Sequence, residues 1–156
     1  MLSNQDNVVF SGSKVLNFSI IIPTYNESAN IVRLISEIEK NMPGLESTEI
    51  IVVDDNSPDG TGNLVENYIK NKALGKNEKA VKRNEVELSE TKIKVIHRKE
   101  KNGLIPAIME GVAVSNGKYI LIMDADFSHP PEVIPKMIEE LRINPRCIVV
   151  ASRYVN

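Results

Sequence analysis

The chain has 156 residues, of which 42% are hydrophobic and 26% are charged, as is typical of one soluble globular domain. Its formal net charge of −2 argues against a nucleic-acid-binding protein, and its single cysteine, Cys147, excludes a disulfide within the chain. Cys147 lies in an apolar run, so we expect a buried structural thiol in a reducing, cytoplasmic location. We expect no membrane span and no signal peptide, because no apolar run is long enough and the N-terminus lacks a basic region.

Strands and helices are predicted to alternate along the chain after an irregular lead-in at residues 1–17. Near-continuous apolar runs predict buried strands, and apolar residues at helical spacing predict amphipathic helices. Pro23 is expected to end the first strand. The predicted strands are 18–22, 49–53, 92–96, 119–123 and 146–151, and the predicted helices begin near residues 28, 61, 106 and 131.

Residues 72–91 carry many charges of both signs with little periodicity, which predicts a solvated insertion or a long flexible connection. A short exposed helix around residues 78–87 is the alternative. The alternation of strands and helices predicts an α/β fold with a mostly parallel sheet and helices on both faces. In such sheets, ligands bind beyond the carboxyl ends of the strands. Four polar segments follow strands and should form one composite site: 23–27, 54–60, 97–103 and 124–129.

Asp124 and Asp126 follow an apolar strand, and side chains two residues apart on a strand point the same way. Two such carboxylates suit a divalent cation that also binds a phosphate-bearing ligand. Ser128 could add an oxygen ligand, and His129 could contact the metal. The alternative is a group of helix-capping residues ahead of the next helix, with His129 in an exposed turn.

The other loops offer groups that could bind a nucleotide. Tyr25 could stack on a base, Glu27 could accept hydrogen bonds from a ribose, and Asp54 or Asp55 could accept from a base or ribose. The alternatives are a helix-starting acid for Glu27 and plain turn and capping residues for the aspartates.

Cations for a diphosphate are available in the basic loop, which holds Arg98, Lys99 and Lys101, and at Arg153. A solvated basic loop is the alternative. Neither a Rossmann GxGxxG fingerprint nor a P-loop is present in the sequence.

Taken together, the loops resemble those of the inverting family 2 glycosyltransferases, and within them the group of dolichol-phosphate mannosyltransferases and other polyprenyl-phosphate glycosyltransferases. The resemblance rests on FSIIIPTYNE, EIIVVDDNSPDGT, RKEKNGLIPAIMEG, IMDADFSHPP and SRY, at residues 18–27, 49–61, 98–111, 122–131 and 152–154. It implies a GT-A fold, which is a Rossmann-like nucleotide-diphospho-sugar transferase fold, with residues 18–156 as the nucleotide-sugar-binding part. It also implies a Mg²⁺ or Mn²⁺ cofactor.

The resemblance also implies roles for individual residues. The nucleoside would be surrounded by Pro23, Tyr25, Glu27, Val53 and Asp55, and the donor would also contact Arg98, Lys101, Asp124 and Ala125. Asp126 would ligate the metal together with Asp124 and Ser128, and Arg153 would face the donor or acceptor phosphates. Asp126 and Arg153 are therefore the expected catalytic residues.

The activity implied is transfer of mannose from GDP-mannose, or of another sugar from a UDP-sugar, to a polyprenyl (dolichyl) phosphate with inversion. The acceptor phosphate is already ionised, so no strong general base is needed. The enzyme would contact the cytoplasmic face of a membrane through a C-terminal part or a partner protein, and it would not bind nucleic acid.

Two departures from the family pattern matter. The family's Gly-Leu-Gly is replaced by Gly103-Leu104-Ile105 before Pro106, and the acceptor-side half that follows the fifth strand in the family lies beyond Asn156. We therefore expect a truncated domain. The alternative function is a non-catalytic nucleotide-sugar-binding or scaffold module.

Overall fold

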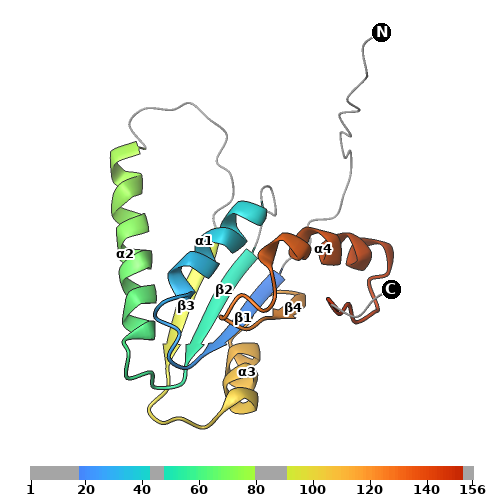
Figure 1. Ribbon diagram of the computed structural model, residues 1–156. Coiled ribbons are helices and arrows are strands. Elements are labelled where there is room, and N and C mark those ends of the chain that lie inside the picture. The colour runs from blue at the N-terminus through green and yellow to red at the C-terminus, as the bar shows by residue number, and fades with distance from the viewer. Residues whose placement is uncertain (1–17, 43–47, 80–90, 153–156) are drawn as a thin grey trace.

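The computed structural model describes residues 18–42, 48–79 and 91–152, and the predicted lead-in at 1–17 lies outside them. These residues form four strands, four α-helices and one short 3₁₀ turn in the predicted alternating order (Figure 1). The elements are β1 (Phe18–Thr24), α1 (Ile31–Asn41), β2 (Thr48–Asp54), α2 (Thr61–Lys79), β3 (Lys92–His97), α3 (Leu104–Ala113), β4 (Tyr119–Ile122), η1 (Pro131–Val133) and α4 (Ile134–Ile143).

The four strands form one parallel sheet in the order β3-β2-β1-β4. β1 and β2 lie at its centre and are buried along their whole length. This position explains their nearly continuous apolar sequences, because a central parallel strand is covered on both faces. The carboxyl ends of all four strands lie at the same edge, which confirms the geometry expected for a composite site.

Helices cover both faces of the sheet, as predicted. Side chains of alternate strand residues point to opposite faces, and those of Ile20 and Ile50 pack with α1, α2 and α4 in the larger core. Those of Ile21 and Ile51 face α3 in a smaller core. α3 approaches closely because it carries Gly111, where a Cβ atom would lie 2.6 Å from the Ile21 side chain.

β1 continues through Pro23 to Thr24, so the prediction that Pro23 ends this strand is wrong. The carbonyl of Ile21 accepts a hydrogen bond from the β4 side and that of Thr24 from the β2 side. Backbone groups two residues apart on a strand point to the same side, so those of Pro23 face the β4 side as those of Ile21 do. On that side β4 has already ended opposite Ile21. The missing N–H of proline therefore breaks no ladder hydrogen bond at this point.

β4 is a half-exposed edge strand and not the fully buried strand that its sequence predicts. Ile120 and Ile122 are 40% and 50% exposed. Both lie in register with residues of β1 whose side chains face α3, but α3 packs over β1 and β2. α3 therefore does not cover the outer part of this face.

The predicted fifth strand is wrong. Residues 146–152 have no regular structure, and Ile148 and Val150 are 91% and 75% exposed. Cys147 is also exposed, so the prediction of a buried thiol is wrong as well. Apolar and β-branched residues form a strand only where a neighbouring strand offers hydrogen bonds and cover, and no described strand pairs with this segment.

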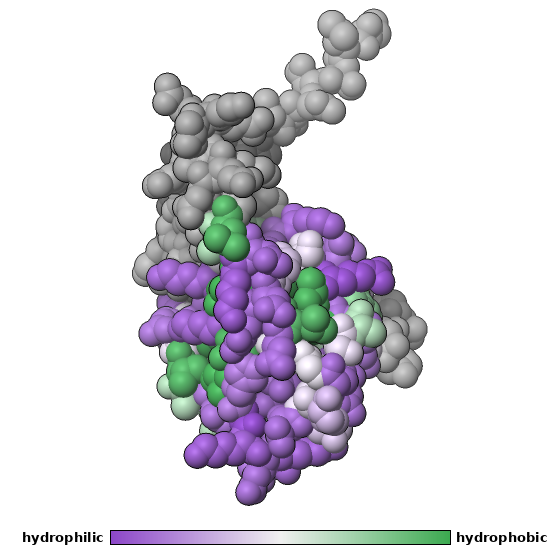
Figure 2. Space-filling view, turned by 90° about the vertical axis from the view of Figure 1, so that its left-hand side faces the viewer, coloured by the Kyte–Doolittle hydropathy of each residue, from purple (hydrophilic) through white to green (hydrophobic). Residues whose placement is uncertain are grey.

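α2 extends to Lys79, so the first part of the predicted insertion, residues 72–79, is helical and not a flexible connection. Residues 80–90 lie outside the described residues. Tyr68 of α2 donates a hydrogen bond to Glu39 of α1 at 2.8 Å. Figure 2 faces the side of the molecule on which α2 lies, and this side is mainly hydrophilic. Within the described ranges, no helix combines the length and the apolar character needed to cross a membrane.

Candidate functional site

The loops that follow β1 and β2 are joined by hydrogen bonds at the carboxyl edge of the sheet. The backbone N–H groups of Asn26, Glu27 and Ser28 donate to side chains of the second loop. The acceptors are Ser57 Oγ at 3.0 Å, Thr61 Oγ1 at 2.9 Å and Asp59 Oδ2 at 3.0 Å, respectively. These N–H groups lie in the loop that leads into α1, whose N-cap is Asn30. The two loops therefore form one unit.

Asp54 and Asp59 serve this unit as turn and capping residues, as the alternative reading of the second loop predicts. Asp54 is buried and accepts hydrogen bonds from Thr24 Oγ1 at 3.2 Å and Ser57 Oγ at 2.5 Å. Asp59 accepts from the backbone N–H and hydroxyl of Thr61 at the start of α2. Hydrogen bonds from Thr61 and Ser28 outweigh desolvation and lower the pKa of Asp59 to about 2.

Asp55 has a different role, because it holds the basic loop that follows β3. Its Oδ1 accepts from Arg98 Nη1 at 2.7 Å and from the Asn102 N–H at 3.1 Å, and its Oδ2 accepts from the Gly103 N–H at 2.8 Å. Arg98 Nε also lies 3.1 Å from Glu110 Oε2 on α3. Asp55 and Arg98 are thus paired with each other, and their predicted contacts with the donor stay predictions.

Lys101 and Tyr25 come together from different loops, as a composite site requires. The Lys101 ammonium lies 3.4 Å from the centroid of the Tyr25 ring, which is a cation–π contact. Tyr25 is 38% exposed, so its ring remains within reach of a ligand. An exposed aromatic ring and a cation from another loop therefore lie side by side, and their predicted contacts with the donor stay predictions.

Glu27 is half-buried at the start of α1. Its backbone carbonyl accepts from the N–H groups of Asn30 and Ile31, and its carboxylate accepts from Asn30 Nδ2 at 3.0 Å. The helix-starting role is therefore present. The hydrogen bond from Asn30 uses Oε2 of this carboxylate, and the predicted ribose contact stays a prediction.

Asp124 and Asp126 lie on the exposed side of their segment, whereas Met123 and Ala125 are buried. Both carboxylates are therefore exposed, although β4 ends at Ile122, and their common direction stays a prediction. Asp126 Oδ1 accepts from the Ser128 N–H at 2.8 Å, and this bond lowers the pKa of Asp126. Asp126 is thus ionised at neutral pH, as a metal ligand must be.

Two further residues shape this loop. Phe127 has a φ of 62°, which is strained for a bulky side chain, and the Arg33 guanidinium of α1 lies 4.6 Å from its ring centroid. His129 Nδ1 lies 3.8 Å from Asp124 Oδ2. The loop therefore packs against α1 while its carboxylates remain exposed.

The donor set fits a divalent cation that is shared with phosphates. In residues 18–42, 48–79 and 91–152, no group of three or more His, Cys, Asp or Glu side chains could enclose a metal. Mg²⁺, however, commonly uses one or two carboxylates and takes its other ligands from substrate phosphates and water. Asp124 and Asp126 supply such a pair, with Ser128 beside Asp126.

The remaining predicted residues are buried or not described. Val53 and Ala125 are at most 3% exposed, and Pro23 is buried within β1. Their side chains therefore pack in the core, and only their backbone groups could face a donor. Arg153 lies outside the described residues.

The contact of Glu110 with Arg98 was not predicted from the sequence. Glu110 lies twelve positions after Arg98 on a helix, where nothing local marks it as a partner of the basic loop. The turn at Gly103 could have been predicted from the sequence, because the Asn-Gly pair before α3 signals a turn. In the structure Gly103 has a φ of 90°, which favours glycine.

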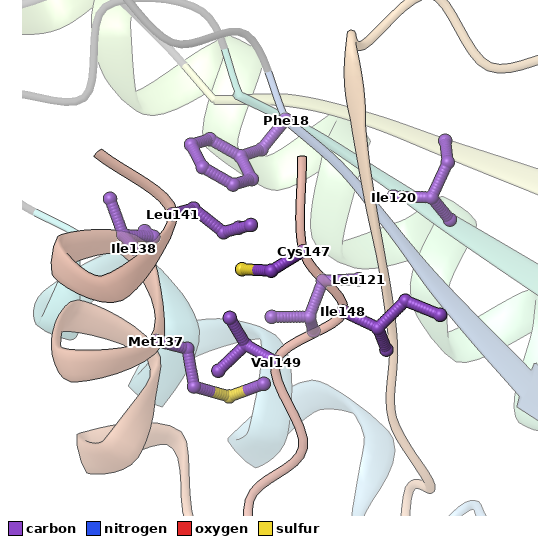
Figure 3. Close-up of a pocket in the computed structure, with 9 residues that line it drawn as sticks. All are labelled: Phe18, Ile120, Leu121, Met137, Ile138, Leu141, Cys147, Ile148 and Val149. Atoms are coloured by element: carbon purple, nitrogen blue, oxygen red, sulfur yellow. The ribbon is translucent and has the colours of Figure 1, made fainter. Parts of the chain in front are cut away.

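An apolar cavity of about 150 Å³ lies elsewhere, between β4, α4 and residues 147–149 (Figure 3). Its wall includes Phe18, the first residue of β1, so it lies toward the amino ends of the strands. It is lined by apolar side chains and Cys147 and offers no charged group for a diphosphate. The cavity is not part of the candidate site.

Comparison with curated proteins finds relatives that match most of this chain. The chain is 41% identical over 140 residues to a dolichol-phosphate mannosyltransferase of Pyrococcus furiosus. This match covers 90% of the chain and 34% of the relative. The chain is also 33% identical over 141 residues to the dolichol-phosphate mannosyltransferase of Saccharomyces cerevisiae, covering 89% of this chain and 45% of the relative. The chain thus spans less than half the length of these relatives.

Solved structures share the fold. The mannosyltransferase PcManGT from Pyrobaculum calidifontis, in complex with GDP-Man and Mn²⁺, is 23% identical with a TM-score of 0.57 over 73% of this chain and 28% of that chain. S. aureus TarS, in complex with UDP-GlcNAc, is 28% identical with a TM-score of 0.53 over 71% of this chain and 27% of that chain. These likenesses confirm the predicted GT-A fold.

The sequence profile described as glycosyl transferase family 2 matches residues 19–156, which includes every loop of the candidate site. The chain therefore belongs to glycosyl transferase family 2.

Proposed function

We propose that this chain is the nucleotide-sugar-binding part of an enzyme that transfers mannose from GDP-mannose to a polyprenyl (dolichyl) phosphate with inversion. The observation that carries this proposal is the exposed pair Asp124 and Asp126, which follows β4 next to the loop that carries Tyr25. The identity to dolichol-phosphate mannosyltransferases supports the choice of sugar and acceptor.

The proposed binding mode assigns one part of the donor to each loop. Tyr25 stacks on the base, Lys101 binds the diphosphate, and Asp124 and Asp126 hold a divalent cation against the phosphates. A bound Mg²⁺ or Mn²⁺ would stabilise negative charge on the departing nucleoside diphosphate. PcManGT was solved with GDP-Man and Mn²⁺, which supports a metal-dependent donor site without choosing between the two ions.

The acceptor in this proposal is a phosphate oxygen that attacks the anomeric carbon from the face opposite the leaving diphosphate. A phosphate monoester is largely ionised near neutral pH, so the site needs no carboxylate as a general base. The absence of a general base fits the described loops, because the carboxylates of Asp54, Asp55 and Asp59 accept hydrogen bonds within the protein. We place the whole enzyme at the cytoplasmic face of a membrane, where a polyprenyl phosphate resides.

A nucleotide titration tests the donor site. GDP, UDP, GDP-mannose and UDP-GlcNAc are titrated by calorimetry with and without Mn²⁺ or Mg²⁺, since TarS was solved with UDP-GlcNAc and UDP-sugars are the competing donors. We expect metal-dependent binding with a preference for the guanine nucleotides. A folded protein that binds none of them would refute the proposal and favour a scaffold role.

Asp126→Ala tests the metal site. We expect it to weaken GDP binding in Mn²⁺ by roughly tenfold or more and to abolish the difference between Mn²⁺ and metal-free buffer. Glu139→Ala, which removes an exposed carboxylate from α4, is the control and should bind as the parent does. If Asp126→Ala keeps its metal dependence, then Asp126 is not a metal ligand.

A further inference from the structure

The basic loop after β3 is held by a buried guanidinium. The side chains of Arg98 and Asp55 are only 8% and 5% exposed, and they form an ion pair at 2.7 Å. Arg98 Nη1 also donates to the carbonyl of Gly103 at 3.4 Å, while Asp55 accepts from the N–H groups of Asn102 and Gly103. The pair thus binds the end of the loop through three backbone groups.

Glu110 holds the same guanidinium from a second side. Its Oε2 lies 3.1 Å from Arg98 Nε, and its side chain is 44% exposed. A planar guanidinium that is bonded at both Nη1 and Nε has a defined orientation, because rotation would break one of the two contacts. Glu110 is therefore in a position to orient Arg98, and Arg98 in turn contacts the loop.

The charge balance argues against Arg98 as the cation for a diphosphate. Two carboxylates, Asp55 and Glu110, lie within 3.1 Å of its nitrogens and compensate its charge. Lys101 differs, since its ammonium lies over the ring of Tyr25, and a cation–π contact does not neutralise the charge. Lys101 directly precedes Asn102 and Gly103, whose backbone groups Asp55 holds, so its position depends on that anchorage.

We propose that Glu110 is a positioning residue for donor binding. It keeps Arg98 oriented, and through Arg98 and Asp55 it holds the 98–103 loop so that Lys101 lies beside Tyr25. This inference rests on the proposed function, because it takes Tyr25 as the base-stacking ring and Lys101 as the cation for the diphosphate. Arg98 then acts within the protein and not on the ligand.

Glu110→Gln separates this role from the alternative, in which Glu110 masks a phosphate-binding arginine. If Glu110 positions the loop, then Glu110→Gln weakens GDP binding in Mn²⁺ by roughly tenfold, as expected when one charge-assisted contact is lost. If it masks Arg98, the same substitution leaves binding unchanged or tightens it, which would overturn the proposal.

Glu100→Gln is the matched control, because it removes the same charge from an exposed position on the same loop. It should leave GDP affinity unchanged or slightly increased, as loss of a nearby negative charge favours an anion. Equal weakening in both variants would show that the effect is not specific to Glu110. If Glu110→Gln does not fold, then Glu110→Asp carries the test, since it keeps the charge but draws the carboxylate away from Arg98.

A double-mutant cycle identifies the residue through which Glu110 acts. Lys101→Ala should itself weaken GDP binding, and adding Glu110→Gln to it should weaken binding by less than twofold more. If the two losses multiply in full, then Glu110 does not act through Lys101 and the proposal fails.

Hydrogen exchange tests the positioning without any nucleotide. In Glu110→Gln, the Asn102 and Gly103 amides should exchange roughly tenfold faster than in Glu100→Gln, because their acceptor Asp55 loses an oriented partner. Unchanged exchange would refute the positioning role. If the parent protein binds no nucleotide but Glu110→Gln shows this faster exchange, only the proposed function is refuted.

Discussion

Glu49 is expected to be a major source of acid sensitivity in this fold. It lies in β2 at the amino end of the sheet, is 6% exposed, and accepts a hydrogen bond from Ser19 Oγ at 2.6 Å. It also accepts from Lys94 Nζ at 2.7 Å and from the Asn116 N–H at 2.5 Å. Ser19 Oγ accepts in turn from the Gly117 N–H at 2.7 Å, so the network ties the turn before β4 to the sheet.

Burial raises the pKa of Glu49, but the hydrogen bonds from Lys94, Ser19 and Asn116 outweigh it and lower the pKa from 4.5 to about 2. A carboxyl group whose pKa falls on folding stabilises the folded state above its unfolded pKa. That stabilisation is lost as the pH falls from 4.5 towards 2. For these two values the contribution is roughly 3 kcal/mol at pH 7 and about half of that at pH 3.

The substitution Glu49→Gln tests this prediction, because it keeps the volume of the side chain but removes its charge. Unfolding in urea is followed by far-UV circular dichroism, because the chain has no tryptophan for fluorescence. The difference in unfolding free energy between parent and variant should be roughly 3 kcal/mol at pH 7 and about half of that at pH 3. Glu139→Gln, at an exposed position of α4, should show almost no difference at either pH. A difference for Glu49→Gln that does not change between pH 7 and pH 3 would refute the reasoning.

Two further predictions concern the loops of the site. Asp59→Ala should lower the unfolding free energy in urea by about 1 kcal/mol, because it removes the acceptors of the Thr61 N–H at the start of α2 and of the Ser28 N–H. Asp59→Ser should restore part of this loss. Gly103→Ala should destabilise by about 1 kcal/mol, since its φ of 90° is unfavourable for alanine although a Cβ atom would meet nothing within 4 Å. Gly103→Asn should cost as much in the same urea unfolding measurement, because Gly103 combines its positive φ with a ψ of 178°, which lies outside the left-handed region that asparagine tolerates. A Gly103→Ala variant as stable as the parent would show that this backbone conformation is not the cause.

Several features of this protein could be predicted from local sequence patterns. The continuous apolar runs of β1 and β2 and the helical spacing in α1 indicate a parallel α/β sheet, and the structure confirms it. The alternation around Asp124 and Asp126 agrees with the structure in that both residues are exposed and Met123 and Ala125 are buried. Such patterns are reliable because strand and helix periodicity decide which side chains share a face, whatever lies further along the chain.

Other features depend on contacts between distant segments and could not be predicted in this way. The apolar run at 146–151 has the composition of a strand, but it stays irregular since no described strand pairs with it. Asp55 and Arg98 each have the residue type of a nucleotide ligand, yet the fold brings them together over 43 positions and pairs them in a buried site.

Sequence alone therefore determined the order of the first four strands and their helices, the sheet type, the family resemblance and the edge at which the candidate site lies. Only the tertiary structure decided which polar residues remain exposed at that edge, such as Asp124 and Asp126, and which ones hold the loops together, such as Asp55, Arg98 and Glu110. The physical reason is that residue type and spacing limit what a side chain can bind. Its actual partners depend on which groups from other elements come within hydrogen-bonding distance, and burial makes an unpaired charge too costly to leave.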